Sequence, residues 1–119
     1  MITKLFVSVL VNNFVSTYSF KGEHGLSLLV TIEENGSQSR ILWDTGQTPE
    51  ILISNLKALD VDPDSISVVA LSHGHYDHTG GLLGFLDSRQ RNIEVLSSSF
   101  SWGDRFNSIS ATRNIGSGL

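Results

Sequence analysis

Hydrophobic residues gather in short runs along the first half of the chain, and polar turn residues separate the runs. Residues 2–11 are rich in Ile, Leu, Phe and Val, which predicts a buried strand. Residues 12–25 are polar and contain glycine, so we expect a loop there. A second strand is predicted over 26–34, and the Asn-Gly pair at 35–36 is a strong signal for a hairpin turn. Residues 40–43 then form the returning antiparallel strand.

A helix is predicted from Thr48 to about Leu59. Thr48 supplies a capping hydroxyl, Pro49 suits a first turn where no amide partner is needed, and an acidic residue follows. Leu52, Leu56 and Leu59 fall on one helical face, which we expect to pack on the core.

The second half of the chain continues to alternate between strand and helix patterns. Residues 66–71 are an uninterrupted apolar run, which predicts a strand buried on both faces. A loop is expected at 72–78, a helix capped by Thr79 at 80–89, and a further strand at 93–96. Helices that alternate with buried strands indicate a layered α/β fold.

The segment after this last strand has a different composition. Residues 97–119 contain seven serines and show no sustained hydrophobic period. We therefore expect a boundary near residue 97, with residues 98–119 either a Ser/Gly-rich tail or the start of a further folded part.

Composition and charge exclude several classes of function. The chain has 119 residues, a net charge of −4 and no cysteine. The absence of cysteine removes disulfides, thiolate catalysis and cysteine zinc sites, and an acidic balance argues against nucleic acid as a partner. The apolar runs are too short and too interrupted to span a membrane or form a signal peptide, so the default expectation is a cytoplasmic protein.

Three of the four histidines lie within six residues, at positions 73, 75 and 78, together with Asp77. Neutral imidazole and carboxylate are the ligands of zinc and similar divalent metals. Alternate side chains of an extended loop point to one side, so His73 and His75 can close on one metal while Asp77 and His78 face a second. The loop also follows a buried strand and precedes a helix, which is where open α/β sheets bind ligands.

Residues 72–81, Ser-His-Gly-His-Tyr-Asp-His-Thr-Gly-Gly, resemble the metal-binding signature of the metallo-β-lactamase superfamily. The Asp-Thr-Gly turn at 44–46 resembles a turn of the same family. Glu-His-Gly-Leu-Ser at 23–27 resembles its dihydropteroate-synthase-like branch, which is related to an archaeal enzyme of the pterin pathway. The match spans about residues 2–96.

The resemblance implies an αββα sandwich of which residues 1–97 would be the N-terminal half, a mixed sheet with helices on one face. It implies that His73 and His75 hold one divalent metal, and that Asp77 and His78 hold the other. Zinc is the expected metal, with manganese or iron as alternatives. Asp44 would accept an imidazole N–H and fix the tautomer of a ligating histidine, unless it serves only to form the turn.

The ligand set of this chain falls short of a complete site. A catalytic zinc normally has three protein ligands and a water, whereas this chain offers two ligands per metal and no histidine after His78. Half a sandwich also leaves one apolar sheet face without a partner. We therefore expect further residues, a second chain or a homo-oligomer to complete the site and cover the sheet.

Three functions remain open at this point. The first is a metal-dependent hydrolase of a small-molecule substrate, in which a binuclear site activates water and Asp77 orients it or takes its proton. The second is a transferase of pterin biosynthesis that uses the same metal loop. The third is a non-catalytic half-domain or a truncated fragment.

For the remaining candidate residues we favour a structural position over a role in the chemistry. His24 and Glu23 are expected in a solvent-exposed loop rather than at the site, and Tyr76 is expected to pack locally. Trp43 ends an apolar strand and is expected in the core. Arg89 is expected at a solvated helix end, where a cation suits the dipole.

Overall fold

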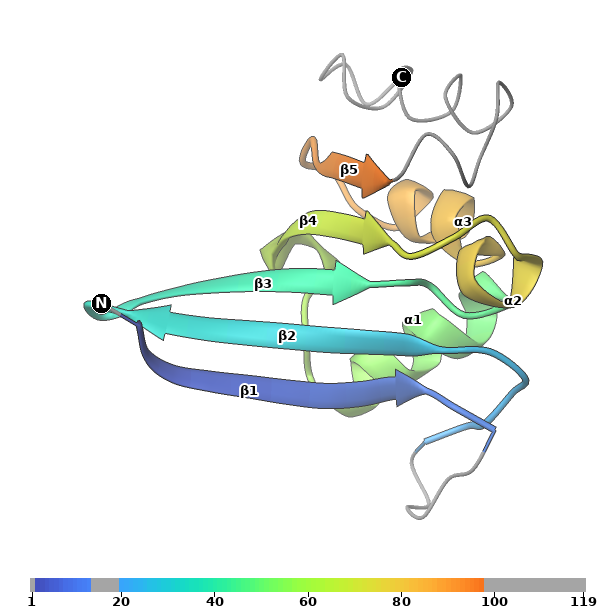
Figure 1. Ribbon diagram of the computed structural model, residues 1–119, viewed down its shortest axis with the longest axis horizontal. Helices are drawn as coiled ribbons and strands as arrows, with labels where there is room; N and C mark the ends of the chain where they lie inside the picture. The colour runs from blue at the N-terminus through green and yellow to red at the C-terminus, as the bar shows by residue number, and fades with distance from the viewer. Residues whose placement is uncertain (1, 14–19, 98–119) are drawn as a thin grey trace.

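The computed structural model describes residues 2–13 and 20–97 of the chain, so the Ser/Gly-rich segment 98–119 lies outside the described residues. Five strands form one mixed sheet in the order β1-β2-β3-β4-β5 (Figure 1). The strands are β1 (Ile2–Val11), β2 (Ser27–Glu34), β3 (Ser37–Trp43), β4 (Ile66–Leu71) and β5 (Glu94–Ser97). The helices are α1 (Pro49–Ala58), α2 (Tyr76–Thr79) and α3 (Leu82–Asp87), with a 3-10 turn η1 at Pro63–Ser65.

The first three strands form an antiparallel meander. Strand β1 pairs with β2 and β2 pairs with β3, both antiparallel. The predicted hairpin turn between β2 and β3 is confirmed: Asn35 and Gly36 have φ angles of 51° and 81°, the left-handed geometry that matches the twist of a tight hairpin. Strand β3 begins at Ser37 rather than at the predicted residue 40, because the tight turn lets pairing start at once.

The last three strands are parallel, and the helices connect them. Strand β3 pairs with β4 and β4 with β5 in parallel register, so α1 and α3 both lie in crossover connections. Crossovers of one hand that proceed in one direction along a sheet place their helices on the same face. The predicted mixed α/β sheet with helices on one face is therefore confirmed, and Figure 1 shows the helices behind the sheet.

The core lies between the sheet and the helices α1 and α3. Val69 and Leu71 of β4 are buried, whereas Val68 and Ala70 on the other face are only half-buried, so the prediction that both faces are buried is wrong. Leu59 is exposed just beyond the end of α1, and the buried residue beside Leu52 and Leu56 is Asn55. The largest fully buried hydrophobic side chains are Phe85, Leu10, Leu29, Leu42, Leu52, Leu56, Ile66, Val11 and Val69.

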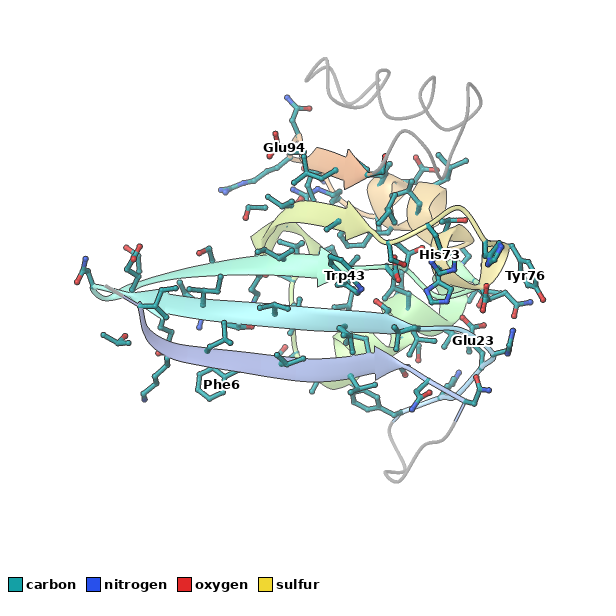
Figure 2. All side chains as sticks on the ribbon, viewed as in Figure 1. Phe6, Glu23, Trp43, His73, Tyr76 and Glu94 are labelled. Carbon is teal, nitrogen blue, oxygen red and sulfur yellow. The ribbon has the colours of Figure 1, made fainter. Side chains whose placement is uncertain are left out.

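Strand β1 is an edge strand and is mostly exposed, so the prediction of a buried strand is wrong. Only Leu10 and Val11, at its end, are buried, whereas Phe6 at its middle is 50% exposed (Figure 2). The helices do not reach the first part of β1, and hydrophobic composition alone does not show how far a covering layer extends.

The sheet face opposite the helices is apolar and open. Residues paired across strands share a face, and here they form a continuous set whose most exposed members are Leu5, Val7, Val9, Trp43 and Leu96. Trp43 therefore lies on this open face and not in the core. The expectation that a second chain or a homo-oligomer covers the face stays a prediction.

The second predicted helix is divided into two pieces. Thr79 is the last residue of α2 rather than a helix cap, and Gly81 precedes α3. Arg89 is buried, not solvated, and its guanidinium donates to the carbonyl oxygens of Pro63 at 2.7 Å and Ile66 at 2.6 Å. It thus ties the end of α3 to the start of β4. No helix among the described residues is long and apolar enough to cross a membrane.

Two adjacent leucines of α3 test this packing. Leu82 is 3% exposed and Leu83 is 49% exposed. Leu82→Ala is expected to lower the free energy of unfolding by about 2–5 kcal/mol because it leaves a cavity. Leu83→Ala is the matched control and is expected to change it by less than about 0.5 kcal/mol. Equal effects in urea denaturation would contradict this core.

Candidate metal centre

The candidate site lies at the edge of the sheet where the parallel strands β3 and β4 end. Residues 44–48 follow β3, and residues 72–81 follow β4 and include α2. Figure 2 shows His73 and Tyr76 at this end of the molecule, with Glu23 from the β1–β2 connection beside them. Parallel strands deliver their following loops to one edge, which is why segments far apart in sequence meet here.

The three imidazoles of the loop lie together. The His73 ring centroid is 4.6 Å from that of His75 and 4.1 Å from that of His78. One candidate ligand atom from each of His73, His75 and Asp77 lies within 4.8 Å of the other two. Asp77 Oδ2 also lies 3.6 Å from His78 Nε2, so the Asp77 carboxylate is close to His78 as well.

Asp44 is a fully buried carboxylate beneath this cluster. Its oxygens accept hydrogen bonds from the Ser72 backbone N–H at 2.7 Å, the Ser72 hydroxyl at 2.6 Å and His78 Nδ1 at 2.7 Å. The backbone of Asp44 has a φ of 59°, a left-handed conformation that Asp tolerates better than most residues. Asp44 also forms a candidate metal-binding group with His73 and His78, and its three accepted hydrogen bonds tie it to the histidine loop.

These hydrogen bonds set the tautomers of two histidines. His78 donates its Nδ1–H to Asp44, which leaves the Nε2 lone pair free. The Ser72 hydroxyl gives its proton to Asp44, so its oxygen accepts from His73 Nδ1, 2.8 Å away. Both rings therefore present Nε2 as a ligand atom, the arrangement that carboxylate-supported histidines adopt in metal sites. The donor set of three imidazoles and one carboxylate fits a divalent metal such as zinc.

Backbone contacts hold residues 44–48 against residues 72–81. The backbone N–H and the hydroxyl of Thr45 both donate to the His78 carbonyl, at 2.7 Å and 2.9 Å. A Cβ atom at Gly80 would overlap the Gln47 carbonyl oxygen, and one at Gly81 would overlap that of Thr45. The two glycines therefore allow the chain after the ligands to approach the turn after β3.

Glu23 is a structural residue of this site that the sequence interpretation missed. Its carboxylate accepts from the backbone N–H groups of Gln47 and Thr48, each at 3.0 Å, and from the Thr48 hydroxyl at 2.9 Å. The Thr48 hydroxyl makes no capping bond to its own helix, so the predicted cap is wrong; it donates to Glu23 instead, which holds the two residues just before α1. The only signal in the sequence was the Glu-His-Gly string at 23–25. The residues that Glu23 binds, Gln47 and Thr48, lie in a different segment of the chain.

The other candidate side chains fall around the rim. His24 Nε2 lies 3.3 Å from Asp77 Oδ2, so His24 adjoins the cluster instead of standing alone in solvent. Tyr76 is exposed in α2, with its ring centroid 6.4 Å from that of His24.

Comparison with known proteins identifies the family. Residues 21–95 match the family model described as the metallo-beta-lactamase superfamily. The chain belongs to this superfamily. Its match includes the turn after β3 and the whole histidine loop.

Named relatives span different activities within the superfamily. Over 76 residues, 64% of this chain and 26% of the relative, the chain is 43% identical to 7,8-dihydropterin-6-methyl-4-(beta-D-ribofuranosyl)-aminobenzene-5'-phosphate synthase of Methanocaldococcus jannaschii. It is 34% identical to ribonuclease Z of Aeropyrum pernix over 82 residues, which cover 64% of this chain and 26% of that protein.

Solved structures with known folds align with this chain. Tm1679, described as a metal-dependent hydrolase of the beta-lactamase superfamily, aligns with a TM-score of 0.54 and 35% identity over 75% of this chain and 28% of its own. A flavo di-iron protein of Thermotoga maritima aligns with a TM-score of 0.53 and 24% identity, over 68% of this chain and 20% of its own, and supports the fold alone. The chain thus spans about a quarter of the length of these relatives.

A substitution of Glu23 tests whether its hydrogen bonds to Gln47 and Thr48 stabilise this superfamily member. Glu23→Gln is expected to lower the free energy of unfolding by about 1–2 kcal/mol, because a neutral amide accepts more weakly from three donors at a helix start. The matched control is Glu50→Gln in the exposed first turn of α1, with an expected loss of about 0.5 kcal/mol. A thermal melt that moves equally for both variants would show that the Glu23 bonds add nothing.

Proposed function

We propose that this chain supplies metal ligands to a metal-dependent hydrolase. His73, His75, Asp77 and His78 would hold the metal, and Asp44 would orient His73 and His78. The observation that carries the proposal is the pairing of three clustered imidazoles with a buried carboxylate that leaves Nε2 free on two of them. Zinc suits this donor set best, and manganese or iron(II) also accepts it.

In the proposed hydrolysis, the cluster binds the metal ion and Asp77 handles the proton of the water molecule. A divalent cation held there would lower the pKa of water toward about 7 and polarise a carbonyl or phosphoryl oxygen of a small-molecule substrate. Asp77 is the proposed catalytic residue, because its carboxylate can orient a water molecule or accept its proton. Asp44 is less suited to that role, since it is fully buried and its oxygens already accept three hydrogen bonds from Ser72 and His78.

A synthase of the pterin pathway is a second candidate. The 43% identity to the Methanocaldococcus jannaschii synthase favours it. That reaction would join a dihydropterin to an aromatic amine phosphate, with pyrophosphate leaving, and the same cluster would serve it. The matched part is about a quarter of that synthase, so the residues that would select such a substrate lie largely outside the comparison.

Metal binding is tested by removing the histidine that both candidate groups share. His73 belongs to each group of possible ligands. His73→Ala is expected to weaken zinc binding by about 100-fold or more, since loss of even a supporting residue costs about 10–100-fold. The measurement is zinc competition against a chromogenic chelator, with metal content by elemental analysis.

Tyr76→Phe is the matched control for the metal test. Tyr76 lies between His75 and Asp77 and is exposed, so its hydroxyl is not needed to hold a cation. The variant is expected to bind zinc as the unaltered protein does. A protein that takes up no zinc, manganese or iron would contradict the proposal.

The two candidate reactions are separated by assay of the metal-loaded protein that contains this chain. Hydrolysis of chromogenic phosphate and carboxylate esters is expected, and His73→Ala is expected to abolish it. Formation of a dihydropterin–arylamine conjugate with release of pyrophosphate, without ester hydrolysis, would overturn the hydrolase in favour of the synthase.

A further inference from the structure

The segment between β1 and β2 delivers a fourth histidine to the metal loop. His24 Nε2 lies 3.3 Å from Asp77 Oδ2, although the two residues come from separate segments of the fold. His24 belongs to neither of the two candidate ligand groups among the described residues. His24 therefore contacts a proposed metal ligand, Asp77, and is not itself a candidate ligand.

The backbone on each side of His24 is fixed. On one side, the Glu23 carboxylate binds the start of α1, and Lys21 N–H donates to the buried Asn55 side chain at 2.8 Å. On the other side, Leu26 N–H donates to the Asp77 carbonyl at 3.3 Å. These anchors hold the backbone on both sides of His24, although 62% of its side chain is exposed.

Gly25 makes the close approach to α2 possible. Its φ of 138° is unfavourable for other residues, and a Cβ there would overlap the carbonyl oxygen of Asp77. The backbone thus passes directly against residue 77, with His24 beside the carboxylate. Both the main chain and the side chain of Asp77 are contacted from this one segment.

We propose that His24 is a positioning residue that holds the Asp77 carboxylate in the orientation needed to bind metal. This inference rests on the proposed metal-binding function. Asp77 has two rotatable side-chain bonds, and the His24 ring nitrogen 3.3 Å from Oδ2 favours the arrangement that keeps this polar contact. An exposed contact of this kind contributes little to folding, so its effect falls on metal binding and not on stability.

The test compares His24→Ala with His24→Gln, which keeps an N–H donor at a similar reach. His24→Ala is expected to weaken zinc binding by about 10-fold, and His24→Gln to restore most of that loss. The midpoint of thermal unfolding without metal is expected to stay unchanged in both. Unchanged zinc affinity in His24→Ala would overturn the proposal.

The absorption spectrum of the cobalt-substituted protein separates positioning from direct ligation. If His24 only positions Asp77, the d–d bands of His24→Gln keep the intensity of the unaltered protein. Bands that change in His24→Gln as strongly as in His24→Ala would mark His24 as a ligand and overturn the positioning role.

A metal-free measurement keeps this inference distinct from the proposed function. Three-bond NMR couplings report the χ1 rotamer of Asp77, which is expected to be single in the unaltered protein and averaged in His24→Ala. Failure to bind metal with this rotamer difference intact would defeat the metal function and leave the positioning contact standing. An identical rotamer population in both proteins would defeat the positioning role even if zinc binds.

Discussion

The buried carboxylate of Asp44 is the interaction on which the site depends. Burial of a charge is costly unless hydrogen bonds replace its hydration, and here Ser72 and His78 provide three donors. Those same donors belong to the histidine loop. One carboxylate therefore joins the end of β3 to the segment after β4 and sets two imidazole tautomers.

Close backbone packing makes this connection rigid. Thr45 binds the His78 carbonyl through both its N–H and its hydroxyl, and Gly80 and Gly81 leave no side chain between the segments. Glu23 brings the β1–β2 connection to the same place through the start of α1. Three separate parts of the chain thus converge beside the histidine cluster.

The sheet has one face packed by helices and one face that stays apolar and open among the described residues. The ligand cluster stands at the edge between these faces, where Trp43 ends β3. The fold therefore leaves an apolar surface uncovered beside the histidine cluster among the described residues.

Much of this arrangement follows from local sequence. The Asn-Gly hairpin, the helix beginning at Pro49, the parallel strand at 66–71 and the histidine spacing are short-range patterns, because turns, caps and strand periods depend on neighbouring residues. The exposure of β1 and the burial of Arg89 could not be predicted in this way, since each depends on which distant surface packs against the residue.

The sequence by itself determined the superfamily, the α/β fold class and the set of candidate ligands, because these are written in contiguous motifs. Only the tertiary structure decided that Glu23 binds Gln47 and Thr48 just before α1, that Asp44 bonds to Ser72 and His78, and that His24 meets Asp77. Each of these contacts joins residues more than twenty positions apart. Their geometry exists only after the sheet has brought the strand ends together.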